Sequence, residues 1–499
     1  MTAESIGPDA DVRSRPQTAI EPRRSKALKI HSSGLGPGFE KVVVSAIAEL
    51  QPVADSGIAL AVIKDGALCF AGGFGLRDRS AGKEVNAETC FAVGSATKAF
   101  TSMAISMQVA EGKLAFDVPI RQYLPDFKMK DPQAAAEATL KDALCHRTGL
   151  PRHDALWYLN PFNRSELFYR LPYLDPIPGA FRKTFIYNNL VYMVAGNLLE
   201  NLFGTSWEAV IKARILDPLG MAASSLSLAD LVGQPDYAKG YEKAAEIPLK
   251  NFNNIGPAAE INSTVLDMAK WIRLFLDRGV APGGKAIISE AALQAMYTAL
   301  IGVGNGVSYG LGWFVGATEG KRLIFHDGDA DGNSAYVSFM PDDGLGVIAL
   351  SNQHCTPDLV GVWPDKVVAR IYEYLLEGKV AGRLSLPPRL APVGAAVATG
   401  PVPAAAPGAP APGGYTGMFS HPAYGDISVS PAGSHLRINY YNSSWPLEQL
   451  SATSFYFALQ AFGANRKVPV TFHLDGSGTV DALAIPLEPT VAPIQFVKR

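Results

Sequence analysis

Ser95 and Lys98 have the residue types and the spacing that nucleophilic catalysis needs. They lie three residues apart at the start of an apolar, helix-like stretch that runs to Gly112. On a helix this spacing places both side chains on one face, and the free N–H groups of the first turn favour negative charge. A serine hydroxyl is a weak nucleophile until a base takes its proton, and a lysine whose pKa is lowered by burial can be that base. Taken alone, the spacing is also typical of an ordinary helix start with an exposed lysine.

Two later stretches carry residues that complete such a site. Tyr187 and Asn189 come just before an apolar helix-like run, and His326 and Gly328 stand at the end of an expected strand. A buried tyrosine near a lysine can relay a proton, and a side-chain amide can orient the lysine and bind a substrate carbonyl. A histidine can hold a substrate carboxylate or carbonyl, and the glycine lets a substrate backbone lie along the strand edge. The alternatives are a helix start in a polar loop and a structural histidine.

The patterns around these residues predict the elements that hold them. Apolar periodicity predicts a helix over 39–50, then a hairpin of strands 58–63 and 68–74 around a Lys-Asp-Gly turn. Between about 114 and 300, helical patterns alternate with Pro- and Gly-rich loops. Strands are expected again at 310–315, 322–326, 334–340 and 346–351, followed by a helix over 359–376. This order predicts an α/β (α+β) fold, with an antiparallel sheet flanked by helices and a helical subdomain at about 114–300.

Changes in composition mark the ends of this unit. Residues 1–35 carry Pro, Gly and charge without periodicity and are expected to form a disordered leader before a catalytic domain at 36–385. Residues 386–414 are rich in Ala, Pro and Gly, which predicts an extended, semi-rigid linker. Residues 415–499 show short strands at regular spacing, typical of a small all-β barrel or sandwich.

The overall composition limits the classes of function. The chain has 499 residues, 48% hydrophobic and 18% charged, with a net charge of −2, which argues against nucleic acid or an anionic membrane as the main partner. No apolar run approaches the ~20 residues that span a bilayer. The first residues lack the order of a signal peptide, so a cytoplasmic location is expected. The four scattered cysteines suit buried, reduced thiols. A homo-oligomer stays open.

The combined motifs resemble those of the serine β-lactamase and penicillin-binding-protein superfamily. Its three motifs are matched by Ser95-x-x-Lys98, Tyr187-x-Asn189 and His326-x-Gly328. Residues 144–151 are similar to that family's LLSHTSGLP stretch, and residues 309–313 to its YGLGW. The likeness is strongest to class C β-lactamases, D-aminopeptidases, DD-peptidases and esterases (peptidase family S12-like), and covers roughly 38–377. Residues 415–499, with Leu-Glu-Pro near their end, look like the C-terminal β domain of a subset of these hydrolases.

The resemblance implies a role for each matching residue. Ser95 is expected to be the acylated nucleophile. Lys98 and Tyr187 would share the general-base and general-acid work, with the first proton acceptor left open. Asn189 would orient Lys98 and a substrate amide. The oxyanion hole would be formed by the backbone N–H groups of Ser95 and Asp329.

Three other positions complete the candidate set. His326, with Gly328 beside it, stands where true β-lactamases carry a lysine, so any β-lactam hydrolysis should be slow. Glu260 lies where relatives often have a Gly-Gly-rich segment. It would bring a carboxylate to the pocket wall and favour a basic substrate, unless it is a solvated loop residue. No cofactor is expected, and His146, His153 and Asp154 fit no standard metal spacing.

Three functions are consistent with this sequence. The leading hypothesis is an acyl-enzyme peptidase or amidase acting on small or linearised peptides, with D- or unusual residues; linearised microcystin-type peptides are one instance. The second is an esterase or acyl transferase, including a peptide cyclase, that uses the same residues. The third is a non-catalytic binding or sensor module, although a binding module needs neither the nucleophile nor its base.

Overall fold

The computed structural model describes residues 35–36, 38–50, 55–354, 364–382, 384–386, 412–433, 435–461 and 464–499. Nearly all of the expected leader and most of the expected linker, residues 387–411, therefore lie outside the described residues, as does Cys355.

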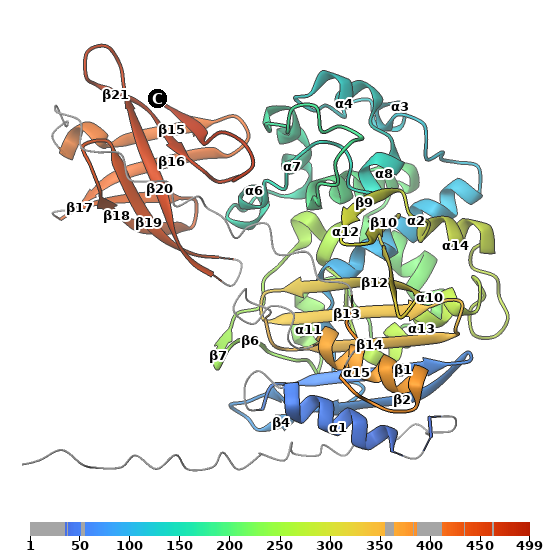
Figure 1. Cartoon of the computed structure of the whole chain (residues 1–499). Coiled ribbons are helices and arrows are strands. Elements are labelled where there is room, and N and C mark those ends of the chain that lie inside the picture. The colour runs from blue at the N-terminus through green and yellow to red at the C-terminus, as the bar shows by residue number, and fades with distance from the viewer. Residues whose placement is uncertain are drawn as a thin grey trace, which may run out of the picture.

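One antiparallel sheet of eight strands forms the centre of the larger unit (Figure 1). The strands follow the order β2-β1-β14-β13-β12-β11-β10-β9. Their bounds are Ile58–Lys64 (β1), Ala67–Phe74 (β2), Ile301–Gly304 (β9), Val307–Tyr309 (β10), Phe314–Thr318 (β11), Lys321–Ala330 (β12), Asn333–Met340 (β13) and Leu345–Ser351 (β14). The predicted antiparallel sheet is confirmed, although residues 310–313 of the strand expected at 310–315 form the turn between β10 and β11, and only 314–315 belong to a strand, β11.

Helices cover both faces of this sheet, which explains why its central strands are apolar at successive positions. Successive side chains of a strand point to opposite faces. In β1, one set of alternate residues packs in the same core as α13 (Val265–Leu276), and the other set packs with α1 (Phe39–Leu50) and α15 (Pro364–Glu377). The strand is thus buried on both faces, and the sheet is a rigid base for the residues at its edges.

A block of short helices lies between β2 and β9 in the sequence, as predicted. Figure 1 shows helices α3 to α8 grouped beyond one side of the sheet. The bounds in this block are Thr97–Ala110 (α2), Ile120–Tyr123 (α3), Pro132–Glu137 (α4), Leu140–Leu144 (α5), Asp154–Tyr158 (α6), Arg164–Arg170 (α7), Asn189–Phe203 (α8), Trp207–Ile211 (α9), Asp217–Leu219 (α10), Leu228–Gly233 (α11), Gly256–Ala259 (α12) and Glu290–Met296 (α14). Short strands β3 to β8 form three two-stranded sheets: Leu76–Asp78 with Lys83–Glu84, Phe91–Ala92 with Asn262–Ser263, and Gly240–Glu242 with Ala245–Ile247.

The C-terminal part is a closed barrel of eight antiparallel strands (Figure 1). Its strands are Gly417–His421 (β15), Gly425–Ala432 (β16), His435–Tyr440 (β17), Ser443–Gln449 (β18), Ser454–Ala461 (β19), Ala464–Leu474 (β20), Val480–Ile485 (β21) and Ile494–Lys498 (β22). Aromatic rings meet in its core, among them Tyr415, Phe455 and Phe472, whose centroids lie 5.0–5.3 Å apart. The predicted all-β domain is confirmed as a barrel.

The barrel contacts the catalytic unit at the start of α6 and around α7. Glu488, after β21, accepts a hydrogen bond from the backbone N–H of His153 (2.8 Å). The Tyr440 hydroxyl accepts one from the side chain of Asn160 (2.8 Å). Tyr440 is therefore buried in the contact between the two units, whereas its neighbour Tyr441 stays 40% exposed.

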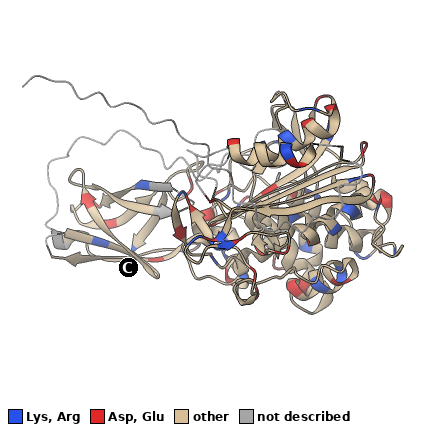
Figure 2. Ribbon diagram, turned by 90° about the horizontal axis from the view of Figure 1, so that it is seen from below, with Lys and Arg blue, Asp and Glu red and all other residues tan. Residues whose placement is uncertain are grey.

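Charged residues of both signs are interspersed over the barrel and the catalytic unit (Figure 2). This distribution agrees with the net charge of −2. Among the described residues, we find no helix whose length and apolar character would let it cross a bilayer.

Candidate active site

Ser95 lies on a tight turn and not, as the sequence predicts, in the first turn of an α-helix. It is the middle residue of a 3-10 turn, Gly94–Ala96, that leads directly into α2. Gly94 has a φ of 52°, and a Cβ at this position would lie 2.7 Å from the backbone nitrogen of Asp329. Only glycine combines this backbone conformation with so close an approach. The backbone of β12 at Asp329 therefore packs directly against the turn that carries Ser95.

Lys98 is fully buried and has three hydrogen-bond partners. Its Nζ lies 2.7 Å from Asn189 Oδ1, 3.1 Å from the Ala258 carbonyl oxygen and 3.1 Å from Ser95 Oγ. The amide and carbonyl oxygens can only accept, so they take two N–H groups of the lysine. In a neutral amine the remaining position is a lone pair, and it faces the Ser95 hydroxyl. This arrangement suits a base that removes the serine proton.

The pKa values of Lys98 and Tyr187 are shifted in opposite directions. Burial, and next the charge of Arg152, lowers the pKa of Lys98 well below its usual value. Burial raises the pKa of Tyr187 well above its usual value, although a hydrogen bond with Ser95 acts in the other direction. The Lys98 Nζ lies 4.6 Å from the centroid of the Tyr187 ring. These shifts favour a neutral amine at Lys98, which can accept a proton, and a neutral phenol at Tyr187, which can donate one.

The start of α8 positions the second motif. Asn188 caps the helix by accepting a hydrogen bond from the Val191 N–H (3.2 Å), which satisfies one of the helix's free donors. The next residue, Asn189, then points its amide oxygen at Lys98 and its amide nitrogen at Asp154 Oδ1 (3.4 Å). The structure thus brings together the four residues of the first two motifs from α2, its preceding turn and the start of α8.

His326 lies close to this cluster, but both ring nitrogens have partners inside the protein. Nδ1 lies 2.5 Å from the Asp327 carbonyl oxygen, which can only accept, so Nδ1 carries the proton. Nε2, 2.9 Å from the Tyr309 hydroxyl, then accepts. Burial, and next the nearby Lys98, lowers the pKa of His326 to about 3. A substrate-binding role for His326 stays a prediction, and it requires the ring to leave one of these partners.

Asp329 has a partner that the sequence did not indicate. The carboxylate lies 2.9 Å from Nδ1 of His354, three residues after the end of β14. Burial favours the neutral form of His354, but Asp329 raises the pKa of the ring to about 9. The side chain of Asp329 is therefore balanced by a positive charge, and its backbone N–H is the group that the sequence assigned to the oxyanion hole.

Glu260 is buried, so the alternative of a solvated loop residue is wrong. It is 4% exposed, and Oε1 accepts a hydrogen bond from the Leu228 N–H (3.1 Å). It lines a small pocket whose other walls include Ala92, Lys250 and Asp331. Burial raises the pKa of Glu260 to about 8. The carboxyl group is thus protonated at neutral pH, which weakens the predicted preference for a basic substrate.

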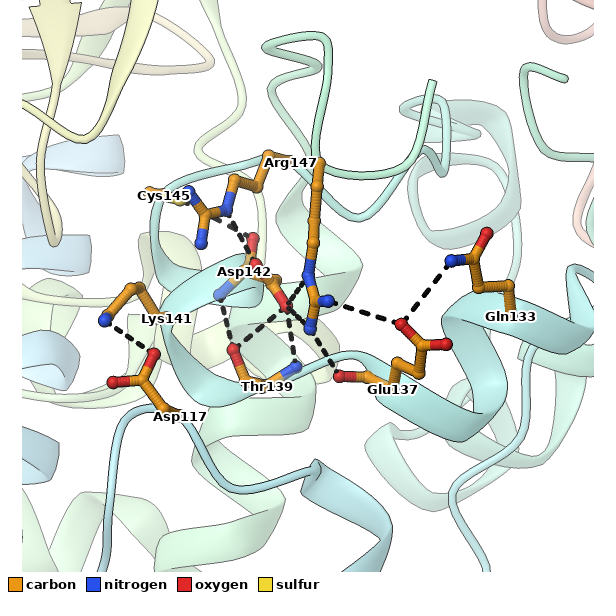
Figure 3. A network of polar contacts seen from close by, with 9 residues as sticks. Asp117, Gln133, Glu137, Thr139, Lys141, Asp142, Cys145 and Arg147 are labelled. Atoms are coloured by element: carbon orange, nitrogen blue, oxygen red, sulfur yellow. Dashed lines mark hydrogen bonds and ion pairs between the residues drawn. The ribbon is translucent and has the colours of Figure 1, made fainter. Parts of the chain in front are cut away.

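Helix α5, directly before the turn at His146, is held by a network centred on the buried carboxylate of Asp142 (Figure 3). Asp142 accepts hydrogen bonds from the Thr139 N–H (3.0 Å) and from Arg147 Nε (2.6 Å), and it forms a capping box with Thr139. His146 itself accepts a hydrogen bond from the Asn188 N–H (3.2 Å), and its ring lies 4.3 Å from that of Tyr187. His146, between this network and the second motif, therefore connects Asp142 and Arg147 to Asn188 and Tyr187.

Arg152 and Asp154 also lie at the candidate site; the sequence analysis did not select Arg152, and it considered Asp154 only as a metal ligand. Arg152 lies 5.0 Å from the centroid of the Tyr187 ring and is paired with Asp154. Asp154 also accepts hydrogen bonds from Asn189 and from the Trp157 indole (2.8 Å). The signal for Arg152 in the sequence was its place directly after the stretch ending at Pro151.

Comparisons with known proteins identify both units of the chain. A family model described as Beta-lactamase matches residues 47–367, and one described as Domain of unknown function (DUF3471) matches residues 404–498. The chain is 28% identical to Unguisins hydrolase ungD of Aspergillus violaceofuscus (strain CBS 115571), over 92% of this chain and 89% of that protein. It is 26% identical to Protein flp of Staphylococcus aureus (strain N315), over 59% of each chain.

A solved structure shows the same fold. The octameric penicillin-binding protein homologue from Pyrococcus abyssi aligns with a TM-score of 0.58 and 22% identity, covering 92% of this chain and 99% of that one. Together with the family match over most of the catalytic unit, these findings show that the chain belongs to the β-lactamase family, carries the β-lactamase and penicillin-binding-protein fold, and has an additional C-terminal barrel.

Proposed function

We propose that the protein is a serine hydrolase that forms an acyl-enzyme at Ser95 and cleaves amide bonds in small or linearised peptides. The observation that carries the proposal is the bonding of Lys98. Its amine lies 3.1 Å from Ser95 Oγ, while Asn189 and Ala258 occupy its other positions. A binding module would have no use for a nucleophile with a buried, neutral base beside it.

The proposed reaction follows from this arrangement. Lys98 takes the Ser95 proton as Oγ attacks the substrate carbonyl carbon, and the backbone N–H groups of Ser95 and Asp329 bind the resulting oxyanion. Tyr187 gives its proton to the leaving nitrogen as the C–N bond breaks, and the proton on Lys98 restores the phenol. Water then attacks the acyl-enzyme, with the same groups acting as base and acid, and releases the acid product and free Ser95.

The open part of β12 supports a peptide substrate. β11 pairs with β12 only from Lys321 to Phe325, whereas β13 pairs along β12 from Ile324 to Ala330. Residues 326–330 therefore pair with β13 on one edge and, within the described part of the chain, with no strand on the other edge, which lies beside Ser95. An extended peptide can add to such an edge through its backbone. The name of the relative called Unguisins hydrolase also favours hydrolysis. The neutral His326 favours slow turnover of β-lactams.

Labelling with a fluorophosphonate tests the proposal. We expect the purified protein to gain one adduct in its intact mass, because only an activated serine reacts readily, and Ser95→Ala to gain none. Ser106→Ala is a matched control, since Ser106 is a buried serine farther along α2, and it should still be labelled. After this test, unlabelled native protein would be screened against peptide and D-amino-acid amide libraries. An unlabelled native protein, or label that persists in Ser95→Ala, would overturn the proposal.

A further inference from the structure

Arg152 places a lasting positive charge beside the candidate nucleophile. Burial favours the neutral form of Lys98 and lowers the pKa of His326 to about 3, so neither is a dependable cation for a substrate. Burial alone would lower the pKa of Arg152, but the negative charge of Asp154 and its hydrogen bond outweigh this effect. The net result is a raised pKa, so the guanidinium stays charged. The guanidinium carbon lies 5.0 Å from the centroid of the Tyr187 ring, and the Tyr187 hydroxyl is bonded to Ser95.

The contact with Asp154 leaves donors of this arginine free for a further partner. The contact with Asp154 is made through Nε. Among the described residues, it is the one hydrogen bond that the Arg152 side chain donates. The side chain is 19% exposed, so part of the guanidinium reaches solvent. The two terminal nitrogens carry four N–H groups in the plane that matches a carboxylate.

The backbone on both sides of Arg152 is fixed, which holds the guanidinium in place before a ligand arrives. Asn188 donates a hydrogen bond from its side chain to the Pro151 carbonyl oxygen. On the other side, His153 donates its N–H to Glu488, and its ring lies between the Tyr424 hydroxyl (2.9 Å) and the Asp175 carbonyl oxygen (3.0 Å). A side chain held in this way loses little entropy on binding.

We propose that Arg152 binds a carboxylate of the substrate through its terminal nitrogens and so selects peptides that carry an acidic group near the scissile bond. The inference rests on the proposed acyl-enzyme chemistry at Ser95. Planar pairing of guanidinium and carboxylate through two N–H···O bonds gives both attraction and orientation. The carboxylate is expected to approach from the helical side of the site, because Asp327 of β12 faces the site from the sheet side and would repel a second carboxylate.

Matched pairs of ester substrates test this inference. In each pair the two esters differ only in a carboxylate or the corresponding carboxamide, placed on the acyl side in one pair and on the leaving side in the other. We expect the native enzyme to prefer the carboxylate member of one pair by about tenfold or more in kcat/KM, mainly through KM. Arg152→Gln should remove this preference, which is a ratio measured within one variant and therefore does not depend on how the loss of Arg152 changes the absolute rates through Lys98 and Tyr187. Arg152→Lys should keep part of the preference, because lysine retains the charge without the planar pair.

Arg147→Gln is the matched control, because Arg147 is also paired with an aspartate in the same loop region, at a distance of 2.6 Å. It should keep the preference for the carboxylate. If the native enzyme shows no preference in either pair, or if Arg152→Gln slows both members equally, Arg152 only supports Tyr187 and the inference is wrong.

Binding measurements keep this test separate from the test of catalysis. The corresponding amide peptides would be titrated by calorimetry into Ser95→Ala and into the double variant that also carries Arg152→Gln. A lower Kd for the carboxylate peptide that is lost in the double variant supports the inference, and equal Kd values overturn it. A missing fluorophosphonate adduct would instead count against the acyl-enzyme proposal.

Discussion

At the scale of single residues, the charge state of Lys98 decides the direction of proton transfer. Burial, and next the charge of Arg152, lowers the pKa of the lysine well below its usual value, whereas Asp154 and Asp327 act in the opposite direction. The net shift favours the neutral amine, which can accept the serine proton. Tyr187 remains protonated for the same reason, since burial penalises the phenolate.

The pH dependence of turnover should show these assignments. Lys98 is a base with a lowered pKa, so its active neutral form is present above that pKa and is lost as the pH falls through it. Tyr187 is an acid with a raised pKa, so its active form is lost only on the far alkaline side. His326, with a pKa of about 3, should add no inflection near pH 6.5. Measuring kcat/KM from about pH 4 to 10 checks this profile. An inflection near neutrality that disappears in His326→Gln would contradict it.

The residues of the first two motifs could be predicted from their spacing, whereas Arg152 and Asp154 could not. Ser95 and Lys98 lie three residues apart where a 3-10 turn leads into α2, and Tyr187 and Asn189 lie at the start of α8. In each pair, local geometry alone predicts that the two side chains lie close together. Arg152 and Asp154 join the site through contacts with Tyr187 and Asn189, 35 residues away along the chain in each case. No periodic pattern records a contact made between two loops.

At the scale of elements, the fit between β12 and the turn of Ser95 sets the shape of the site. A Cβ at Gly328 would lie 1.9 Å from the carbonyl oxygen of Val93 and 3.3 Å from the backbone nitrogen of Ser95. Neither neighbour is a flexible side chain. The strand and the turn are therefore in direct backbone contact, and any added atom must separate them.

Gly328→Ala should separate the strand from the turn. Displacing the Asp329 N–H from Ser95 is expected to lower kcat by about 100-fold, because an oxyanion donor acts only at short range. The overpacking should cost about 1–3 kcal/mol of stability. Steady-state kinetics and urea unfolding measure the two effects. Gly302→Ala is the control, since a Cβ on this glycine of β9 would meet no atom within 4 Å. Equal kinetics for the two variants would refute the prediction.

The elements that the sequence missed are those with mixed polarity. Buried hairpins such as β1 and β2 stood out because their residues are apolar without interruption. β18, with the sequence SSWPLEQ, contains a proline and a glutamate and is mostly exposed, so its pattern resembles a loop. β15 and β22 are short and complete the barrel by pairing with each other. Closure of a barrel is a long-range property, and only the tertiary structure reveals it.

At the scale of the whole molecule, the barrel is part of the support of the active site. Glu488 is 2% exposed and accepts hydrogen bonds from the His153 N–H and from the Thr490 hydroxyl. His153 directly precedes Asp154 and follows Arg152, which touch Asn189 and Tyr187. A chain of contacts thus connects the barrel to the candidate catalytic residues.

Glu488→Ala should lower kcat although Glu488 touches no candidate catalytic residue. Loss of the acceptor for the His153 N–H lets the loop move, and small displacements of positioning groups are expected to reduce turnover by roughly ten- to a hundredfold. Glu488→Gln keeps an acceptor oxygen and should restore most of the rate. Glu448→Ala, on the exposed strand β18, is the control for changes within the barrel. If circular dichroism shows that Glu488→Ala is folded and its kcat is unchanged, the barrel contact has no catalytic role.

The contact between Glu488 and His153 also has a consequence for the synthesis of the protein. The ribosome makes the catalytic unit before the barrel, so every residue of the two catalytic motifs emerges while Glu488 is still unmade. The loop at residues 151–154 receives its last hydrogen-bond partner only when translation has passed the seventh barrel strand. We therefore expect the proposed activity to appear in full only late in synthesis, since a chain truncated before Glu488 contains Ser95 but lacks the acceptor for the His153 N–H.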